Sequence, residues 1–447
     1  MFRDRDRDRD RDRDRDRDRG RPPAVPRLRP GRDDEWRCPL AGDADATLLS
    51  VFRHIVDHGP LTRPELGTGV GLARATTSGA VNDLMRRGLV AELAPAPQAG
   101  PQGRRGRPTA LLDLDDERHA VAGLEIGIDR ILSAVYSLRG RELLRTERSV
   151  EPESVNPRSL LRRAQTALRE VLDAAEDDRR TLLGVGVSVP GLVDASTGTV
   201  KYVPSLGWRD VALRAGVDEA LGGRTPVLVD GDANFAALAE RRARLREGLE
   251  AASLIYLTGT YGISAGVIAD GRLWRGGRGM AGEVGHLVVD PDGPVCVCGR
   301  RGCFETRAGL SAITTEALEP AAHRRRAGAA RAVLSAAVDE LVARARTGDE
   351  RVCGVLTEAG RWLGRGAAAL TAVLDPRVVV LGGHYARLAP WVLEPAREAF
   401  AGAQLVPGTD IPTLEVSAGA DWAPTEGAAL AVLMSFADGS RPLPAAD

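Results

Sequence analysis

The spacing of apolar residues changes twice along the chain and divides it into three parts. The first part, residues 1–46, has no apolar period: positions 3–19 alternate strictly between arginine and aspartate, and a proline-rich, charged stretch follows. Such a segment cannot bury enough apolar surface to offset the entropy lost on ordering, so we predict that it is disordered. Nucleic-acid binding by this tail is the less favoured alternative, because the aspartates cancel the charge of the arginines.

Helical spacing begins near Thr47. Gly59–Pro60 ends the first helix, and Thr62–Glu65 fits a capping box that opens a short second helix. A glycine-rich turn leads to a third helix from about Ala73 to Arg87. The apolar stripes that we expect to face inward are Leu48, Leu49, Phe52, Ile55 and Val56 in the first helix, and Ala80, Val81, Leu84 and Met85 in the third.

Two short strands follow, one starting at Leu89–Val90 and one over 110–114. Three helices and a two-stranded wing over residues 47–114 predict a winged helix-turn-helix DNA-binding domain, with a small protein-binding helical domain as the alternative. Residues 47–110 contain eight arginines and four acidic residues, and this local charge of +4 suits contact with phosphates.

The expected DNA contacts lie on the outer face of the third helix and in the wing loop. The Arg-Gly-Arg-Pro run of that loop resembles an AT-hook that reaches into a minor groove, and a flexible arginine-rich turn is the alternative. The side chains in question are Arg74, Thr76, Thr77, Ser78, Asn82, Arg104, Arg105 and Arg107.

From about His119 the pattern changes to the two-residue period of strands. Three alternating stretches predict a β-meander over 120–150, a helix follows over about 157–176, and apolar strands are expected over 182–189 and 227–230. The 447 residues leave room for two or three domains, and their net charge of −1 gives no global basic character. The chain lacks a signal peptide and any run of about 18 apolar residues, which predicts a cytoplasmic protein without membrane contact.

A metal-ligand pattern lies late in the chain. His286, Cys296, Cys298 and Cys303 follow the order H-x9-C-x-C-x4-C, although the chain has only five cysteines. Three thiols and one imidazole suit tetrahedral Zn²⁺, and a full ligand set makes the ion structural rather than catalytic. The alternative is a group of buried thiols beside a core histidine. Free thiols of this kind fit a reducing cytosol.

The segments GMAGEVGH and CVCGRRGCFE around this pattern resemble the ROK family, which contains sugar kinases and sugar-responsive transcriptional regulators. The resemblance implies an α/β fold of two lobes, actin-like or ribonuclease H-like, over residues 119–440, with the zinc loop at 286–303. It also implies sugar contacts from Glu283, His286 and Glu305. The segment 59–90 is similar to the DNA reader of the family's regulators, with Ala73 where they usually have serine at the N-cap of the recognition helix.

Two further motifs carry the same resemblance. Gly231–Ala237 reads GDANFAA and is similar to the family's N-D-A-N-A-A, which implies sugar contacts from Asp232 and Asn234, and Gly231 replaces the first asparagine. In the family's kinases the aspartate is the general base, so Asp232 would be its vestige here; a plain helix cap is the alternative. Pro190–Asp194 and Leu206–Trp208 resemble elements near the sugar cleft, and Trp208 could equally serve packing.

The nucleotide side departs from the kinase pattern. The phosphate hairpin, D-x-G-G-T in the kinases, reads Glu125-Ile126-Gly127-Ile128-Asp129, and the second phosphate loop carries Tyr261 and Ser264. A carboxylate facing phosphates and side chains in place of glycines predict that the chain is not an enzyme.

The resulting hypothesis is a sugar-responsive transcriptional regulator, most simply a repressor. Its partners would be double-stranded operator DNA and a sugar or sugar derivative, and it would act as a homodimer or homotetramer with structural zinc. An active ATP-dependent sugar kinase with an accessory DNA-binding domain is the first alternative. A DNA-binding scaffold with a vestigial sugar cleft is the second.

Overall fold

The computed structural model describes residues 43–93, 110–150, 157–203, 206–223, 225–259, 262–318, 333–404 and 411–446. Residues from Asp43 onward belong to one unit. The wing-loop residues Arg104, Arg105 and Arg107, and Tyr261 of the second phosphate loop, lie outside the described ranges. Among the described helices, none combines the length and the apolar character that a membrane crossing requires.

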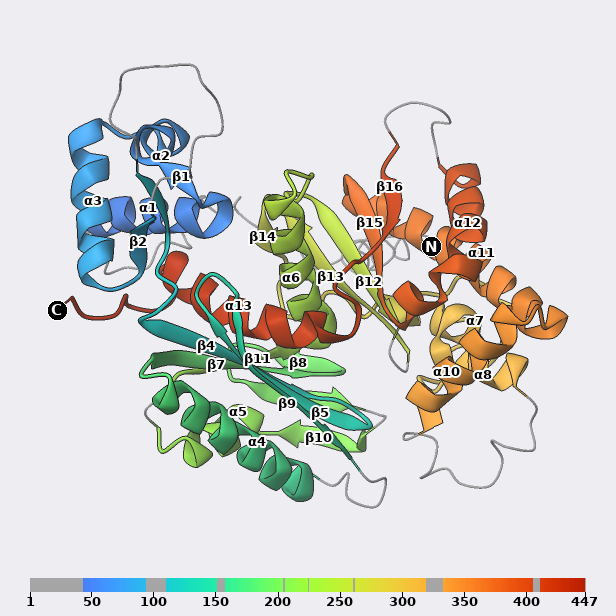
Figure 1. Ribbon diagram of the computed structural model, residues 1–447. Helices are drawn as coiled ribbons and strands as arrows, with labels where there is room; N and C mark the ends of the chain where they lie inside the picture. Colours follow the sequence, from blue (N-terminus) through green and yellow to red (C-terminus); the bar gives the residue numbers. More distant parts are fainter. Residues whose placement is uncertain are drawn as a thin grey trace, which may run out of the picture. The chain divides into compact units, whose positions relative to one another are not determined.

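The N-terminal module, which we call the reader, has three helices and a small sheet (Figure 1). The sheet has three strands in the order β1-β3-β2, one more than predicted, because Leu61 and Thr62 pair with Leu112 and Leu111. The predicted inward residues Phe52, Ile55 and Leu84 are all buried, as expected. The elements are α1 (Asp43–His58), β1 (Leu61–Thr62), α2 (Arg63–Val70), α3 (Arg74–Arg86), β2 (Val90–Leu93) and β3 (Leu111–Leu114).

The starts of helices α2 and α1 confirm one prediction and correct another. The capping box at α2 is confirmed: the Thr62 side chain accepts from the Glu65 amide, and the Glu65 carboxylate accepts from the Thr62 amide. Residues 43–46, predicted to belong to the disordered tail, instead form the first turn of α1. Asp45 favours the earlier start, since an acidic side chain stabilises the positive end of a helix.

The structure of helix α3 disagrees with one predicted DNA contact. Thr77 was expected on its outer face, but the structure buries it to 1% exposure, and its hydroxyl donates to the carbonyl of Ala73. The helix periodicity that suggested an outer position did not account for α2, which packs over this turn. Arg74, Thr76 and Asn82 remain exposed on the outer side.

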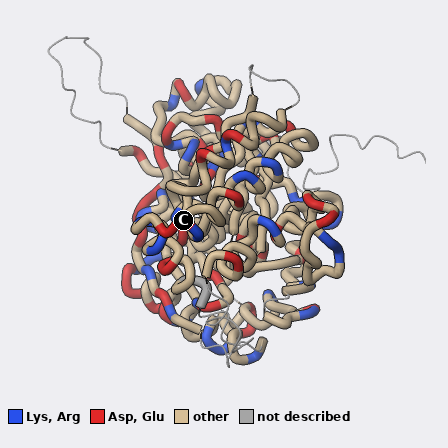
Figure 2. Tube along the Cα trace, turned by 90° about the vertical axis from the view of Figure 1, so that its right-hand side faces the viewer, with Lys and Arg blue, Asp and Glu red and all other residues tan. Residues whose placement is uncertain are grey.

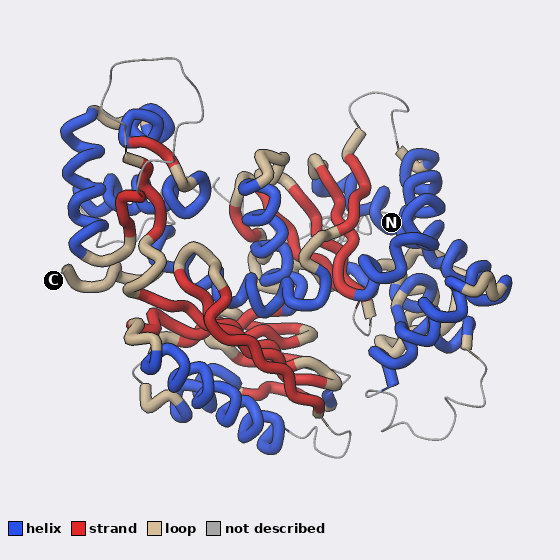
Figure 3. Tube along the Cα trace, in the orientation of Figure 1, coloured by secondary structure: helices blue, strands red, loops and turns tan. Residues whose placement is uncertain are grey.

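The first lobe of the remaining chain is a mixed five-stranded sheet in the order β11-β7-β4-β5-β6. The predicted meander is confirmed, and β7 pairs in parallel with both β4 and β11. Helix α4 packs on one face and α13 on the other (Figures 1 and 3), so the central strands are buried on both sides and mostly apolar, with Glu125 and Ser188 among the exceptions. The elements are β4 (His119–Ile126), β5 (Arg130–Ser137), β6 (Glu142–Ser149), α4 (Pro157–Asp177), β7 (Thr181–Val189), α5 (Leu213–Ala220) and β11 (Val227–Gly231).

A small antiparallel sheet, β10-β9-β8, accompanies this lobe and consists of β8 (Leu192–Asp194), β9 (Thr199–Val203) and β10 (Trp208–Val211). Trp208 is 1% exposed and belongs to the core beneath the first lobe. Trp208 was expected either near the sugar cleft or in the core, and its burial supports the role in packing.

The second lobe is another five-stranded sheet, in the order β14-β13-β12-β15-β16. Side chains alternate along β12: Leu254 and Tyr256 face the core shared with α6 and α13, whereas Ile255 and Leu257 face the core of α11 and α12. The strands are β12 (Leu254–Gly259), β13 (Ile263–Ala269), β14 (Arg272–Leu273), β15 (Val378–Gly383) and β16 (Thr413–Val416). The helices are α6 (Asp232–Arg246), η3 (Val284–His286), α7 (Glu305–Ala308), α8 (Leu310–Ala317), α10 (Val333–Arg346), α11 (Glu350–Leu374), α12 (His384–Gly402), η4 (Ala420–Trp422) and α13 (Ala423–Ala437).

Helices α6 and α13 cross at the centre with their backbones in contact. A Cβ added at Gly427 of α13 would lie 1.7 Å from the carbonyl oxygen of Phe235 in α6. On its other side α13 meets the sheet at Gly123 and Gly186, where an added Cβ would lie 1.9 Å and 2.0 Å from carbonyl oxygens of α13. Only glycine fits these approaches, so the two helices and the first sheet hold one another in a fixed arrangement.

The start of α3 yields a stability prediction. Its N-cap is Ala73, which makes no side-chain cap hydrogen bond. We expect Ala73→Ser to raise the free energy of unfolding by about 1 kcal/mol, because a hydroxyl there can accept from an orphan amide of the first turn. Urea unfolding measures the change. Ala75→Ser, two residues into the same helix, is the matched control and should not stabilise; equal effects of the two serines would contradict the capping argument.

Candidate functional site

A narrow pocket lies where the two lobes meet; its cavity volume is about 20 Å³, room for about one water molecule. The first lobe contributes the end of β11 and the turn before β8, α6 contributes its first turn, and the second lobe contributes β13 and the loop before η3. The lining residues are Gly191, Leu192, Val193, Asp230, Gly231, Asp232, Ala233, Asn234, Ser264, Ala265, Gly279, Ala281, Gly282 and Glu283.

Asp232 is the buried carboxylate of this pocket. It is the first residue of α6, it is 6% exposed, and its Oδ1 accepts from the amide of Ala233 at 2.7 Å. Burial raises the pKa of Asp232 to about 6, and the negative charge of Glu283 adds to the rise. The side chain is therefore ionised at neutral pH, and it can accept a hydrogen bond from a hydroxyl group.

A second aspartate beside it was missed by the sequence prediction. Asp230 is the next-to-last residue of β11 and is 3% exposed; its Oδ1 accepts from Asn234 Nδ2 at 2.8 Å, and its Oδ2 accepts from Arg275 Nε at 2.7 Å. These bonds fix Asn234 and join the first lobe to the loop after β14. An acidic residue at the carboxyl end of a strand was a usable signal for Asp230. Arg275 had no such signal, because only the tertiary structure brings its loop here.

The four predicted metal ligands come together. The candidate ligand atoms of His286, Cys296, Cys298 and Cys303 all lie within 4.8 Å of one another. Cys298 Sγ and Cys303 Sγ are 3.5 Å apart, and His286 Nδ1 is 3.6 Å from Cys296 Sγ. Such separations fit donors that share one ion at a metal–sulfur distance of about 2.3 Å in a tetrahedron. The arrangement can hold a metal.

The five predicted sugar residues fall into two groups. Asp232, Asn234 and Glu283 line the pocket. His286 and Glu305 instead lie with the thiols: Glu305 Oε1 is 3.0 Å from Cys296 Sγ and 3.6 Å from His286 Nδ1. The two groups are neighbours, since Glu283 immediately precedes the turn η3 that ends at His286. A metal held by His286 would therefore stiffen the turn that carries Glu283.

Another buried acid lies close enough to Asp232 to feel its charge. Glu125, near the end of β4, is 8% exposed, and its Oε2 accepts from the hydroxyl of Thr425 in α13 at 3.3 Å. Burial raises the pKa of Glu125 to about 7; Arg130 opposes the rise, and the charge of Asp232 adds to it. Ile128 fills the following hairpin turn with an apolar side chain, and Asp129 is half-buried beside it.

The reader carries the candidate DNA surface. Arg74, Thr76 and Asn82 are exposed on α3, and Ser78 is partly exposed. Arg63 of α2 lies 3.4 Å from Asn82 Oδ1 and forms an ion pair with Glu92 of the wing at 2.8 Å. Figure 2, which views the molecule from the side away from the reader, shows acidic and basic positions interspersed along the trace.

Comparison with known proteins matches residues 121–434 to the ROK family. The xylose repressor of Caldicellulosiruptor bescii is 30% identical over 359 residues, which cover 78% of this chain and 86% of that protein. The DNA-binding transcriptional dual regulator NagC of Escherichia coli is 28% identical and covers 78% of this chain and 83% of its own length. A glucokinase of Halalkalibacterium halodurans is 31% identical and covers 52% of this chain and 71% of its own length.

Two solved structures share the fold. A ROK family transcriptional regulator, a homologue of the E. coli Mlc protein, aligns with a TM-score of 0.71 at 24% identity, over 89% of this chain and 98% of that one. A ROK family glucokinase from Streptomyces griseus, in complex with glucose and AMPPNP, aligns with a TM-score of 0.59 at 28% identity, over 70% of this chain and 98% of that one. With a family match across more than half of its length, this chain belongs to the ROK family.

Proposed function

We propose that this chain is a sugar-responsive DNA-binding repressor. The observation that carries the proposal is the presence, in one chain, of a winged-helix reader and a pocket lined by acidic and amide side chains. Relatives named as repressors or transcriptional regulators match 78% of the chain, whereas the glucokinase relative matches 52%. Operator DNA is the partner of the reader, through Arg74, Thr76, Ser78 and Asn82.

The ligand of the pocket is a neutral sugar. Asp232, Asn234 and Glu283 offer acceptors for hydroxyl donors. His286 and Glu305 would add sugar contacts from the side of the metal ligands. A polyol fits because it brings hydrogen bonds without adding another negative charge to a pocket that already holds Asp230, Asp232 and Glu283. The missing side chain at Gly231 leaves room, since an added Cβ would still be 3.7 Å from its nearest neighbour.

Phosphoryl transfer is not expected from this cleft. Glu125 and Asp129 put carboxylates where phosphate oxygens would have to bind, and two like charges about 4 Å apart repel by about 4 kcal/mol at an effective dielectric constant near 20. Ile128 adds bulk where a close backbone approach is needed. The position of Asp232 and the glucokinase relative favour an active sugar kinase as the second candidate.

Zinc is the ion proposed for the four-ligand set, because three thiolates and one imidazole form a soft tetrahedral environment. The set is closed, so the ion would brace the loop and take no part in chemistry. Thiols free to bind a metal and a DNA target both support a cytoplasmic location for the working protein. A homodimer or homotetramer would let two readers contact the two halves of an operator.

The first test measures DNA and sugar binding together. Full-length protein is titrated onto DNA from upstream of its own gene, with and without D-xylose, D-glucose or N-acetyl-D-glucosamine at millimolar concentration. We expect one sugar to weaken DNA binding, and Asp232→Asn to weaken that sugar's calorimetric affinity by about 10- to 150-fold, because a charged acceptor contributes about 1.5–3 kcal/mol. Asp173→Asn, an exposed aspartate of α4, is the control and should behave as wild type.

Three results would contradict the proposal in different ways. ADP release from ATP in the presence of a sugar, lost in Asp232→Asn, would establish the kinase. DNA binding without any sugar binding would leave a scaffold with a vestigial cleft. Sugar binding that leaves DNA affinity unchanged would remove the regulatory role, because a ligand with equal affinity for both states shifts nothing.

A pH dependence follows from the raised pKa of Asp232. Its carboxylate is ionised above about pH 6 and protonated below it, so the sugar loses a charged hydrogen-bond acceptor as the pH falls. We expect sugar affinity to be constant above pH 7 and to fall by up to about tenfold per pH unit below 6. Calorimetry between pH 8 and 5 measures it. Glu125→Gln should keep this profile; a profile unchanged in Asp232→Asn would assign the titration to another group.

Metal content gives a further prediction. Purified protein should contain about one zinc ion per chain by elemental analysis, and Cys303→Ser should lose most of it, because a structural site needs all four ligands. Cys353→Ser is the matched control: this thiol of α11 lies outside the ligand set and should leave the zinc content unchanged. Zinc retained in Cys303→Ser, or absent from wild type, would contradict the assignment.

A further inference from the structure

Helix α6 takes part in both the pocket and the contact with the reader. Its first turn supplies Asp232, Ala233 and Asn234 to the pocket lining. Its later turns contact α1 of the reader. Arg241 follows Asp232 by nine positions, a distance of about 14 Å along a helix. Residues 232–241 are all buried, so the helix cannot bend or fray easily over this span.

The far contact is a buried, bidentate ion pair. Arg241 Nη1 and Nη2 donate to Asp57 Oδ1 and Oδ2 at 2.8 Å and 2.9 Å. The side chains are 8% and 11% exposed. Asp57 lies in the last turn of α1, and Arg53 of the same helix donates to its Oδ2 at 2.8 Å and to the carbonyl of Gly271 at 3.1 Å. The forked geometry fixes both the distance and the angle between α6 and α1.

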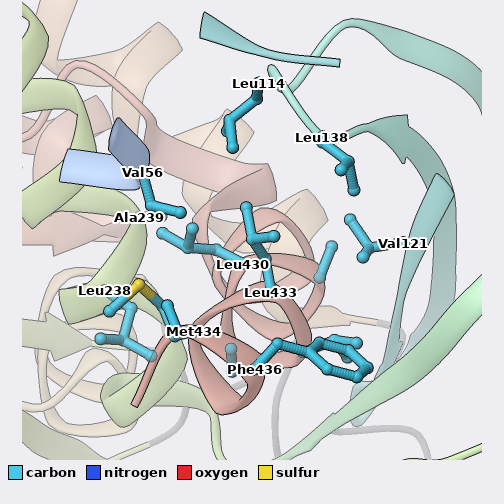
Figure 4. Packing of buried hydrophobic residues seen from close by; sticks show 14 of the residues in the cluster. Val56, Leu114, Val121, Leu138, Leu238, Ala239, Leu430, Leu433, Met434 and Phe436 are labelled. Carbon is cyan, nitrogen blue, oxygen red and sulfur yellow. The ribbon is translucent and has the colours of Figure 1, made fainter. Parts of the chain in front are cut away.

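Apolar packing surrounds this pair. Val56, next to Asp57 in the reader, belongs to the same buried cluster as Leu238 and Ala239 of α6 and Leu430 of α13 (Figure 4). The close crossing of α6 and α13 at Gly427 prevents independent movement of the two helices. A shift of α6 must therefore either carry α1 with it or break the pair. Breaking it would leave a buried charge without its partner, which is strongly unfavourable.

The pocket end of α6 is held just as directly. Asn234 donates to Asp230, which also accepts from Arg275 of the second lobe. A ligand that hydrogen-bonds to Asp232 and Asn234 acts on the first turn of α6 and on the inter-lobe contact at once. One end of this rigid helix thus lies at the pocket and the other at the reader, the two sites that a regulator must connect.

We propose that Arg241 is the positioning residue that transmits sugar binding to the DNA reader, through its buried pair with Asp57. This inference rests on the proposed function, because it requires a sugar that alters operator binding. Arg241 touches neither sugar nor DNA; it sets the orientation of α1, and through the reader core the orientation of α3. Loss of the pair leaves both binding sites intact and removes the dependence of one on the other.

The test compares the response ratio, defined as the dissociation constant for operator DNA with sugar divided by that without it. Full-length variants are measured with the member of the three-sugar panel that weakens DNA binding most. For a wild-type ratio of about 5 to 150, we expect Arg241→Gln and Asp57→Asn to bring the ratio within about twofold of 1. Sugar affinity by calorimetry, and operator affinity without sugar, should stay within about threefold of wild type, which a merely structural defect would not allow.

Two controls separate this route from others. Arg244→Gln removes a charge from the same helix at similar burial, but Arg244 pairs with Glu415 and Glu240 instead of the reader, so its ratio should remain that of wild type. Arg87→Gln removes the hydrogen bond from the reader to the carbonyl of Pro444 and tests the C-terminal segment as a competing route. The double variant Asp57→Asn/Arg241→Gln removes both charges of the buried pair, leaves only the partly exposed Arg53 without its carboxylate, and serves if either single variant fails to fold.

The outcomes are distinct. A wild-type ratio of 1 for all three sugars overturns the proposed function, and this inference with it. A wild-type ratio above 1 that persists in Asp57→Asn/Arg241→Gln leaves the function standing and overturns the inference alone. The inference alone is also overturned if Arg244→Gln or Arg87→Gln abolishes the response as completely as Arg241→Gln does. The inference is supported if the response ratio falls to about 1 in the variants of Asp57 and Arg241 and stays at the wild-type value in Arg244→Gln and Arg87→Gln.

Discussion

The contact of helix α13 with its neighbours through glycine is the constraint on which the rest of the structure depends. Gly427 admits the backbone of α6, and Gly123 and Gly186 admit α13 to the first sheet. A methyl group at any of these positions would overlap a carbonyl oxygen, so the contacts have no tolerance for a side chain. They determine where α6 begins, and hence where Asp232 lies between the lobes.

The chemistry of the pocket follows from this placement. Asp232 and Glu125 are buried beside the central helices, and both have raised pKa values because charge is costly there. An uncharged polyol can satisfy such acceptors, whereas phosphates would add negative charge to a site already rich in it. A metal held by the four ligands next to Glu283 would supply rigidity where the second lobe contributes a loop instead of regular structure.

Much of the reader and the metal set could be predicted, because their signals are local. The Thr62–Glu65 cap, the uncapped Ala73 and the closely spaced cysteines depend on residues near one another in sequence, and the structure contains all three features. Thr77 shows the limit: its burial depends on what packs against α3, and periodicity alone could not reveal it. The third strand of the reader sheet likewise depends on pairing between residues that are distant in the sequence, Leu61 with Leu112.

The sequence by itself determined the order of the modules, the donor set for a metal, and Asp232 and Glu283 of the cleft, since side-chain identity and short-range spacing specify these. Only the tertiary structure decided that Arg275 reaches Asp230, that Glu305 lies with the thiols, and that Arg241 pairs with Asp57 across 184 positions. The physical reason is that a buried ion pair requires two backbones to be brought into register by packing elsewhere, and no local pattern encodes that register.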